Sequence, residues 1–155
     1  MNQFYRSIVA LLAFAACAVA QTPPPKPPVG VPADAKLFNG KWYRTYFERV
    51  TWTRAKERCA SLGGQLVVIP DAPTWTFVHG FAADAWLWLG ATDEQTESVW
   101  KWVDGTPMTF KAWGPTQPSN SGGKEHYLHI KNHTWNDTPK DANNVVGFIC
   151  EWKAK

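Results

Sequence analysis

The sequence predicts an α+β domain with two helices early in the chain, several short strands and a long loop region late in the chain. Three observations support this fold class. Apolar residues recur at helical spacing in two early segments, and short alternating or apolar segments lie around them. Glycine, proline and asparagine are frequent between residues 91 and 144. With 45% hydrophobic and 14% aromatic residues among 155, the chain can bury the core of one such domain.

The first predicted elements are a strand and a helix. Residues 41–48 alternate between two faces, as a strand does. Thr51 or Thr53 can cap the helix that follows, and Gly63-Gly64 ends it. One face of this helix carries apolar residues at spacings of three, four and three, namely Trp52, Ala55, Cys59 and Leu62.

The middle of the chain predicts a short strand, a second helix and a buried strand. The short apolar strand covers Leu66–Ile69, and Pro73 marks the start of the second helix. That helix carries an apolar stripe of Phe77, Val78 and Phe81. The segment Trp86–Gly90 is apolar throughout and predicts a buried strand.

The last part of the chain, from Ala91 to Asn144, predicts long loops around short strands at Val99–Val103 and His126–Ile130. A final strand, Val146–Trp152, carries Cys150. Long loops within a compact domain are usually functional, so the binding site is expected in this region.

The first twenty residues predict a signal peptide. Arg6 supplies the positive charge, Ile8–Ala16 the apolar segment, and Ala18-Val19-Ala20 a cleavage site. Cleavage there predicts a secreted or periplasmic protein. An alternative is a lipid anchor at Cys17, because the residues before this cysteine loosely resemble a bacterial lipobox. The longest apolar run, Ile8–Ala20, is too short to span a membrane.

Residues 21–35 hold six of the twelve prolines and predict an extended, semi-rigid linker, which leaves residues 36–155 as the domain. The formal net charge of only +3 argues against a nucleic-acid partner. The sequence contains no Gly-x-Ser-x-Gly elbow, no Walker loop and no dinucleotide fingerprint, so we do not expect an enzyme.

Most of the ten tryptophans are predicted to lie in the core, because large rings dominate the energetics of cores. Trp113 is ambiguous, since it could also stack against a ligand. Three histidines, His126, His129 and His133, do not predict a zinc site among themselves. His126 and His129 are three apart on a predicted strand and therefore face opposite sides.

The order of short motifs across residues 38 to 153 resembles a C-type lectin domain. The resemblance implies a fold with two helices flanking small antiparallel sheets, a long loop region, and carbohydrate binding. The motifs are Trp52-x2-Ala55-x3-Cys59-x3-Gly63-Gly64-x-Leu66, Trp88-Leu89-Gly90, Trp100-x-Trp102-x-Asp104-Gly105, Trp113, Gln117-Pro118-Ser119, Glu125, Trp135-Asn136-Asp137 and Phe148-Ile149-Cys150-Glu151.

The resemblance, together with the spacing, implies a disulfide between Cys59 and Cys150. It would close a loop of about 90 residues, which in the entropy model stabilises by up to ~4.5 kcal/mol. The family's usual second disulfide is absent, because Tyr127 and Lys140 stand where its cysteines would be. This absence predicts a looser loop region.

Oxygen-bearing side chains gather in the late loops and suit Ca²⁺, which takes six to eight oxygen ligands. The resemblance implies a calcium that coordinates two sugar hydroxyls, with a cis peptide bond before Pro118. Departures from the family pattern, Gln117-Pro118-Ser119 in place of a triplet that ends in asparagine or aspartate, imply weak calcium affinity of ~10⁻⁴ to 10⁻³ M. Gln117 slightly favours galactose-type sugars. The implied ligands of the calcium and the sugar are Gln117, Ser119, Glu125, Asn136 and Asp137.

The resemblance also implies an auxiliary calcium bound by Asp93, Glu97, Asn120 and the backbone oxygen of Glu125. His126 replaces the acidic residue that the family has next. Two alternatives remain open: Asp93 and Glu97 can be solvated loop acids, and the main site can have lost its metal. In the second case the chain would be a calcium-independent, lectin-like module that binds a protein partner.

Overall fold

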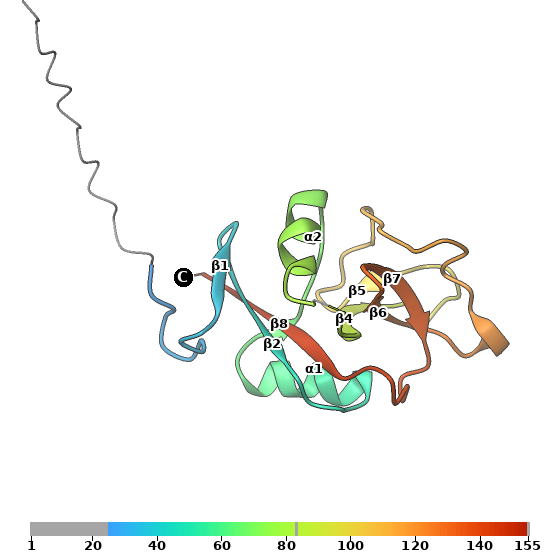
Figure 1. Cartoon of the computed structure of the whole chain (residues 1–155), viewed down its shortest axis with the longest axis horizontal. Helices are drawn as coiled ribbons and strands as arrows, with labels where there is room; N and C mark the ends of the chain where they lie inside the picture. Colours follow the sequence, from blue (N-terminus) through green and yellow to red (C-terminus); the bar gives the residue numbers. More distant parts are fainter. Residues whose placement is uncertain (1–24, 83, 155) are drawn as a thin grey trace, which may run out of the picture.

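The described residues of a computed structural model, 25–82 and 84–154, form one mixed sheet with two helices (Figure 1). The strand order is β1-β2-β8-β4-β6-β7, with β3 paired to β8 and β5 paired to β4. The predicted α+β fold class is confirmed. The predicted signal peptide, residues 1–20, and the alternative lipid anchor at Cys17 lie outside the described residues. None of the described helices is long and apolar enough to cross a membrane.

One end of the sheet is a hairpin of β1 (Lys36–Phe38) and β2 (Lys41–Tyr46). Asn39 and Gly40 join the two strands, and both have positive φ, at 45° and 71°. An Asn-Gly pair suits such a two-residue turn, because both residues tolerate the left-handed region. The alternation in the sequence predicted β2, whereas β1 was not predicted, although the Asn39-Gly40 turn signal was present.

The strand pair next to this hairpin joins β2 to the last strand, β8 (Gly147–Lys153). The two strands pair antiparallel in register along the whole of β2, so the beginning and the end of the domain lie side by side. Both faces of β2 are covered, because Trp42 and Tyr43 point to opposite sides and are each buried. The sheet is therefore a central layer with a core cluster on each face.

The first helix, α1 (Trp52–Ser61), begins where the side chain of Thr51 accepts a hydrogen bond from the backbone nitrogen of Arg54. Thr51, and not Thr53, is thus the capping residue. The helix ends before Gly63, whose φ of 73° favours glycine. Cys59 on the buried face of α1 forms the predicted disulfide with Cys150 of β8.

The second helix, α2 (Ala72–His79), begins at Asp71, whose carboxylate accepts a 2.8 Å hydrogen bond from the backbone nitrogen of Thr74. Hydrogen bonds from Thr74 lower the pKa of Asp71, which keeps the cap charged. Phe77 stacks on Phe38 of β1, with ring centroids 4.4 Å apart. This contact fixes α2 over the hairpin.

The late strands β4 (Leu87–Thr92), β6 (Tyr127–Lys131) and β7 (Thr134–Thr138) extend the sheet beyond β8. β4 pairs parallel with β8, so the sheet is mixed. The resemblance had implied antiparallel pairing only. The chain between these two parallel strands runs through the late loops, β6 and β7. Two shorter elements in this part of the fold are β5 (Lys101–Trp102) and a single 3-10 turn, η1 (Ser121–Gly123).

Three strand predictions differ from the structure in extent or existence. The expected strand at 66–69 overlaps the observed strand β3 (Gln65–Leu66), which pairs with β8, only at Leu66. The expected strand at 99–103 is reduced to β5, and Val99 is about half exposed. β7 was not predicted, because its polar residues hide the alternation, and the positive-φ pair Asn132-His133 forms its turn with β6.

The tryptophans predicted to be structural are buried in the two core clusters. The ring of Trp135 lies at the centre of one cluster. It contacts four other aromatic rings edge-on, with ring centroids 5.6 to 5.8 Å apart: those of Trp75, Trp102, Phe110 and Trp113. Trp113, which was ambiguous, is therefore a packing residue of this cluster. The other predicted core tryptophans are Trp52, Trp88, Trp100 and Trp102.

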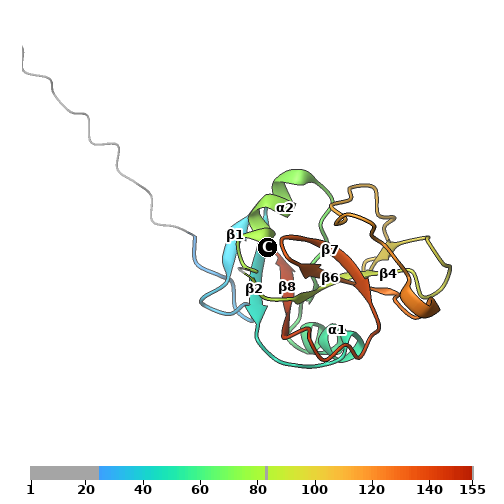
Figure 2. The same cartoon turned by 45° about the vertical axis from the view of Figure 1, so that its right-hand side comes forward.

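The end of the predicted linker folds against the domain instead of extending from it. Backbone hydrogen bonds from Val31 to Pro28 and from Ala35 to Pro32 form two turns, and Asp34 pairs with Arg44 of β2 at 2.7 Å. The small residue Ala35 is buried, so apolar contact with the domain competes with the extended form. Residues 25–35 and the long late loops lie at opposite ends of the described part of the chain (Figure 2).

Candidate metal and carbohydrate site

Four of the predicted site residues are joined by hydrogen bonds where the long loop meets β7. The loop turns at a cis Gln117–Pro118 peptide bond, as the resemblance implied. After this turn, Ser119 and Asn120 contact both Glu125 and Asp137. The structure therefore brings two carboxylates and two neutral oxygen donors into one cluster, which we call the main cluster: Ser119, Asn120, Glu125 and Asp137.

Asp137 anchors the loop to the sheet. Its carboxylate accepts hydrogen bonds from the backbone nitrogens of Ser119, at 3.0 Å, and Asn120, at 2.6 Å. The residue is fully buried and lies on β7 opposite Leu128 of β6. Because hydrogen bonds to a charged acceptor are stronger than neutral ones, this one side chain holds two successive loop residues.

Glu125 closes the other side of the main cluster. One of its oxygens, Oε2, accepts from the Ser119 hydroxyl at 2.9 Å and from the backbone nitrogen of Ser121 at 2.8 Å. Its own backbone nitrogen donates to Asn120 Oδ1 at 3.1 Å. Asn120, expected at the auxiliary site, thus has its side chain in the main cluster.

Gln117 supplies an acceptor that the protein leaves unpaired. Gln117 Oε1 is buried and has no hydrogen-bond partner among the described residues. A buried acceptor without a partner costs free energy, about 1 to 3 kcal/mol. A cation or a ligand hydroxyl at this position would remove that cost. The side chain therefore fits a calcium ion or a sugar.

Asn136 is oriented by a buried histidine, His129, which was not among the predicted site residues. His129 lies opposite Asn136 in the β6–β7 pair, and burial lowers the pKa of His129 to about 4, so its ring is neutral at pH 7. Its Nδ1 lies 2.9 Å from the carbonyl of Ile130, which only accepts, so we assign the proton to Nδ1. Nε2 then accepts from Asn136 Nδ2, at 3.1 Å.

This assignment fixes which end of the Asn136 amide is available. The Nδ2 group donates to His129 and to the carbonyl of Asp137, so Oδ1 is the atom left to ligate or to accept. The signal in the sequence was the Asn132-His133 turn, which sets the register that places His129 opposite Asn136.

The chemistry of these donors suits a hard cation. Glu125 and Asp137 carry the negative charge, and Gln117, Ser119 and Asn136 offer neutral oxygens. The same oxygens are hydrogen-bond partners for sugar hydroxyls. The arrangement has no acid and base flanking a reactive group that would mark a glycosidase, because both carboxylates are used to hold backbone or hydroxyl groups.

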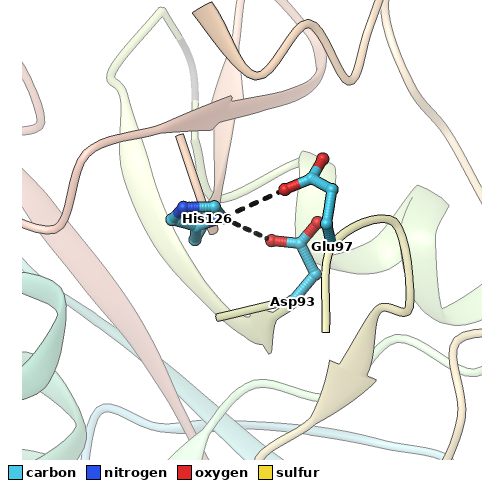
Figure 3. Close-up of side chains that lie close together, drawn as sticks. All are labelled: Asp93, Glu97 and His126. Carbon is cyan, nitrogen blue, oxygen red and sulfur yellow. Dashed lines mark hydrogen bonds and ion pairs between the residues drawn. The ribbon is translucent and has the colours of Figure 1, made fainter. Parts of the chain in front are cut away.

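A second cluster of potential ligands consists of Asp93, Glu97 and His126 (Figure 3). His126 Nδ1 lies 3.1 Å from Asp93 Oδ1 and 3.5 Å from Glu97 Oε2. Asp93 follows β4, and its backbone nitrogen donates to the carbonyl of His126, just before β6. Of the residues implied for the auxiliary site, Asp93 and Glu97 come together here, with His126 as the third member.

The remaining histidines lie elsewhere. The ring of His129 is fully buried, while His126 is partly exposed, in agreement with the expectation that the two face opposite sides. His133 Nδ1 lies 2.8 Å from His79 Nε2, at the end of α2. The three histidines considered in the sequence therefore do not converge on one point.

Comparisons with known proteins match the lectin C-type domain model over residues 48–152. Chicken hepatic lectin is 33% identical over 119 residues, which cover 75% of this chain and 56% of that protein, so the chain spans about half of the length of this relative. The mouse scavenger receptor C-type lectin carbohydrate-recognition domain superposes with a TM-score of 0.75 at 32% identity, covering 81% of this chain and all of that one. A calcium-independent type II antifreeze protein superposes with a TM-score of 0.73 at 25% identity, covering 81% and 95%.

Proposed function

The chain belongs to the C-type lectin domain family, and from that premise we propose that it binds carbohydrate through a calcium ion held in its late loops. Membership confirms the resemblance found in the sequence. It also confirms that the chain is a carbohydrate-recognition domain and not an enzyme. The ligands of the proposed calcium are Gln117, Ser119, Glu125, Asn136 and Asp137.

The observation that carries the proposal is the unpaired Gln117 Oε1. This buried acceptor lies beside the cis peptide bond, in the loop that Asp137 anchors, and no group in residues 25–82 or 84–154 satisfies it. Such an arrangement is costly unless a ligand completes it. A calcium ion would supply a positive centre to which sugar hydroxyls bind.

The other residues of the site either position the loop or offer ligand atoms. Asp137 positions the loop through two backbone nitrogens, and Glu125 offers a charged acceptor for a metal or a hydroxyl. His129 turns the Asn136 amide so that its oxygen is available. Gln117 favours galactose-type over mannose-type sugars, and the presence of only two formal charges favours weak calcium binding.

We also propose that the domain acts outside the cytoplasm. The Cys59–Cys150 disulfide suits an oxidising compartment, and the first twenty residues have the pattern of an export signal. Binding by a single shallow site is weak, so useful affinity for a glycan surface would require several copies of the domain.

A second candidate function is a calcium-independent binding module. The observation that favours it is the hydroxyl of Ser119, which donates to Glu125 where a metal ligand is expected. Both carboxylates of the main cluster already accept hydrogen bonds from the protein. The similarity to an antifreeze protein described as calcium-independent agrees with this alternative.

Thermal unfolding with and without calcium decides between the two. With a Kd of ~1 mM, about 10 mM Ca²⁺ should stabilise the purified protein by about 1.4 kcal/mol relative to chelator, a shift of several degrees. Glu125→Gln, which removes one charge with little change in shape, should abolish the shift. Glu57→Gln removes an exposed charge from α1, away from the late loops, and should leave the shift intact.

Sugar binding is then measured with immobilised galactose and mannose, in calcium and in chelator. Elution from galactose by chelator supports the proposal. A calcium response without retention on either sugar rejects the carbohydrate part of the proposal. Retention on either sugar that is unchanged in chelator, together with no thermal shift, favours the calcium-independent module.

A further inference from the structure

We propose that Asp93, Glu97 and His126 bind a transition metal ion, represented by Zn²⁺, and that this site prefers Zn²⁺ to Ca²⁺. The site is separate from the main cluster, so the proposal does not depend on the proposed function. It assigns to the second cluster a metal of a different class from the calcium that the family resemblance implied.

The positions of the three side chains match the size of a tetrahedral site. Ligand atoms about 2.0 Å from a tetrahedral metal are separated from one another by about 3.3 Å. The two distances from His126 Nδ1 are 3.1 Å to Asp93 Oδ1 and 3.5 Å to Glu97 Oε2. All three potential ligand atoms lie within 4.8 Å of one another. A metal can therefore enter with small side-chain adjustments.

The kinds of donor atom favour zinc. Ca²⁺ requires six to eight oxygen ligands, and this cluster offers two carboxylates and one imidazole nitrogen. Imidazole is a preferred ligand of Zn²⁺ and related ions, and three protein ligands with one open position are typical of zinc sites that bind water. Asn120, which could have added an oxygen, is instead bound to the backbone nitrogen of Glu125.

The cluster combines a fixed ligand with an accessible one. The side chain of Asp93 is 2% exposed, and its second oxygen accepts from the backbone nitrogen of Ser98 at 2.8 Å, which fixes the carboxylate. The side chain of Glu97 is 51% exposed, and that of His126 is 27% exposed. An ion can therefore reach the site from solvent and meet a ligand that is already in place.

The charge of the cluster also favours a divalent cation. Two carboxylates face one imidazole, so the cluster places two acidic side chains around one point. A divalent cation bound there would be balanced by both carboxylates, and the imidazole nitrogen would complete three protein ligands.

Metal at this position would act on the main cluster through the backbone. His126 follows Glu125 directly, and its carbonyl accepts the backbone nitrogen of Asp93. Fixing the His126 ring to Asp93 and Glu97 would restrict the backbone that presents Glu125. Zinc should therefore slow hydrogen exchange at the backbone nitrogens of Glu125 and Ser121, which donate within the main cluster.

Isothermal titration of the chelator-treated, full-length purified protein tests the proposal. Zn²⁺ should bind with one-to-one stoichiometry and at least tenfold more tightly than Ca²⁺ at this site. His126→Ala should weaken zinc binding by at least about tenfold, because losing a direct ligand costs no less than losing a group that orients one. His126→Asp should reverse the preference toward Ca²⁺, since it leaves only oxygen donors.

Two controls make the result specific. His133→Ala removes a histidine that contacts His79 and lies outside this cluster, and it should leave zinc binding unchanged. Glu125→Gln should abolish calcium-dependent sugar binding but leave zinc binding intact, so failure of the proposed function is distinguishable from failure of this inference. No saturable zinc binding, or zinc binding that survives His126→Ala, would overturn the proposal.

Discussion

Two regions of this domain are ordered in different ways. The frame, which comprises residues 36–92 and 147–153, is held by buried apolar side chains, paired strands and one disulfide. The loop region, residues 93–126, has little regular structure, and its backbone is tied down by the carboxylates of Asp93, Glu125 and Asp137. Negative side chains thus provide local order and also form the candidate ligands.

This difference has a consequence for stability. Each side chain in the core of the frame packs against many others, so a substitution there lowers the free energy of unfolding of the whole domain. Hydrogen bonds in the loop region are local and often exposed, so their loss can be absorbed by local opening. Perturbations of the frame should therefore lower global stability, whereas perturbations of the loop region should act chiefly on binding and local exchange.

The largest expected effect on the frame comes from removing its cross-link. Replacing Cys59 and Cys150 together by alanine frees a loop spanned by a sequence separation of 91 residues. In the entropy model the free energy of unfolding should fall by about 4.5 kcal/mol. Urea unfolding measures the loss, with the reduced wild-type protein as control. A loss below about 1 kcal/mol would show that the frame does not depend on its disulfide.

The next largest effect is expected at Glu151, a buried acid on β8. Its carboxylate accepts from Lys41 at 2.8 Å, from Gln65 at 2.9 Å and from the backbone of Val68. Burial raises the pKa of Glu151, and Lys41 opposes the rise. Lys41→Met should therefore destabilise the protein at pH 7 by about 2 kcal/mol, because it leaves a buried charge without its cation.

The raised pKa of Glu151 also predicts how the destabilisation by Lys41→Met changes with pH. A carboxyl whose pKa is raised on folding stabilises below its ordinary pKa of 4.5, and that stability is lost as the pH rises through the folded value. Removing Lys41 raises the folded pKa further. The deficit of Lys41→Met should thus be largest at pH 7 and shrink toward pH 4.5. Arg54→Met breaks an exposed pair with Glu57 and should cost at most about 0.5 kcal/mol.

A smaller effect is expected from the cap of α1. Thr51→Ala removes the hydroxyl that accepts from the backbone of Arg54, and should reduce the free energy of unfolding by about 1 kcal/mol. Thr53→Ala changes a neighbouring threonine that does not cap the helix and should be close to neutral. Equal losses in the two variants, measured by thermal unfolding, would contradict the assignment of the cap.

The same contrast explains which features the sequence predicted. Elements of the frame have periodic apolar residues, so the patterns around Trp52, Phe77 and Leu87 located both helices and the buried strand β4. β7 and the positions of its neighbours were harder to predict, because Asn136 and Asp137 are polar and buried. Their burial depends on hydrogen bonds to His129 and to loop residues distant in sequence, which no periodicity records.

The second cluster shows the same limit at the level of chemistry. Asp93 and Glu97 were named from the family resemblance, and His126 was noted only as a departure from it. The histidine at this position either removes the metal site or changes the kind of ligand, and the direction of His126 Nδ1 decides which. That direction is set by the pairing between the end of β4 and the start of β6, including the Asp93 to His126 hydrogen bond. The pairing lies beyond what a single sequence specifies.

The smallest expected change in global stability tests the loop region directly. Ser119→Ala removes the hydroxyl that donates to Glu125, but it keeps the backbone nitrogen that donates to Asp137. Since this hydroxyl bond is exposed, the free energy of unfolding should fall by no more than about 0.5 kcal/mol. Hydrogen exchange at the Ser121 backbone nitrogen, which shares Glu125 Oε2, should nevertheless accelerate.

Ser61→Ala is the matched control in the frame, since Ser61 also donates from an exposed hydroxyl, to the carbonyl of Arg58 in the last turn of α1. It should leave exchange at Ser121 unchanged. If Ser119→Ala lowered global stability as much as Thr51→Ala, the loop region would unfold together with the frame. The carboxylates that hold its backbone would then contribute to the stability of the whole domain, as the apolar side chains of the frame do.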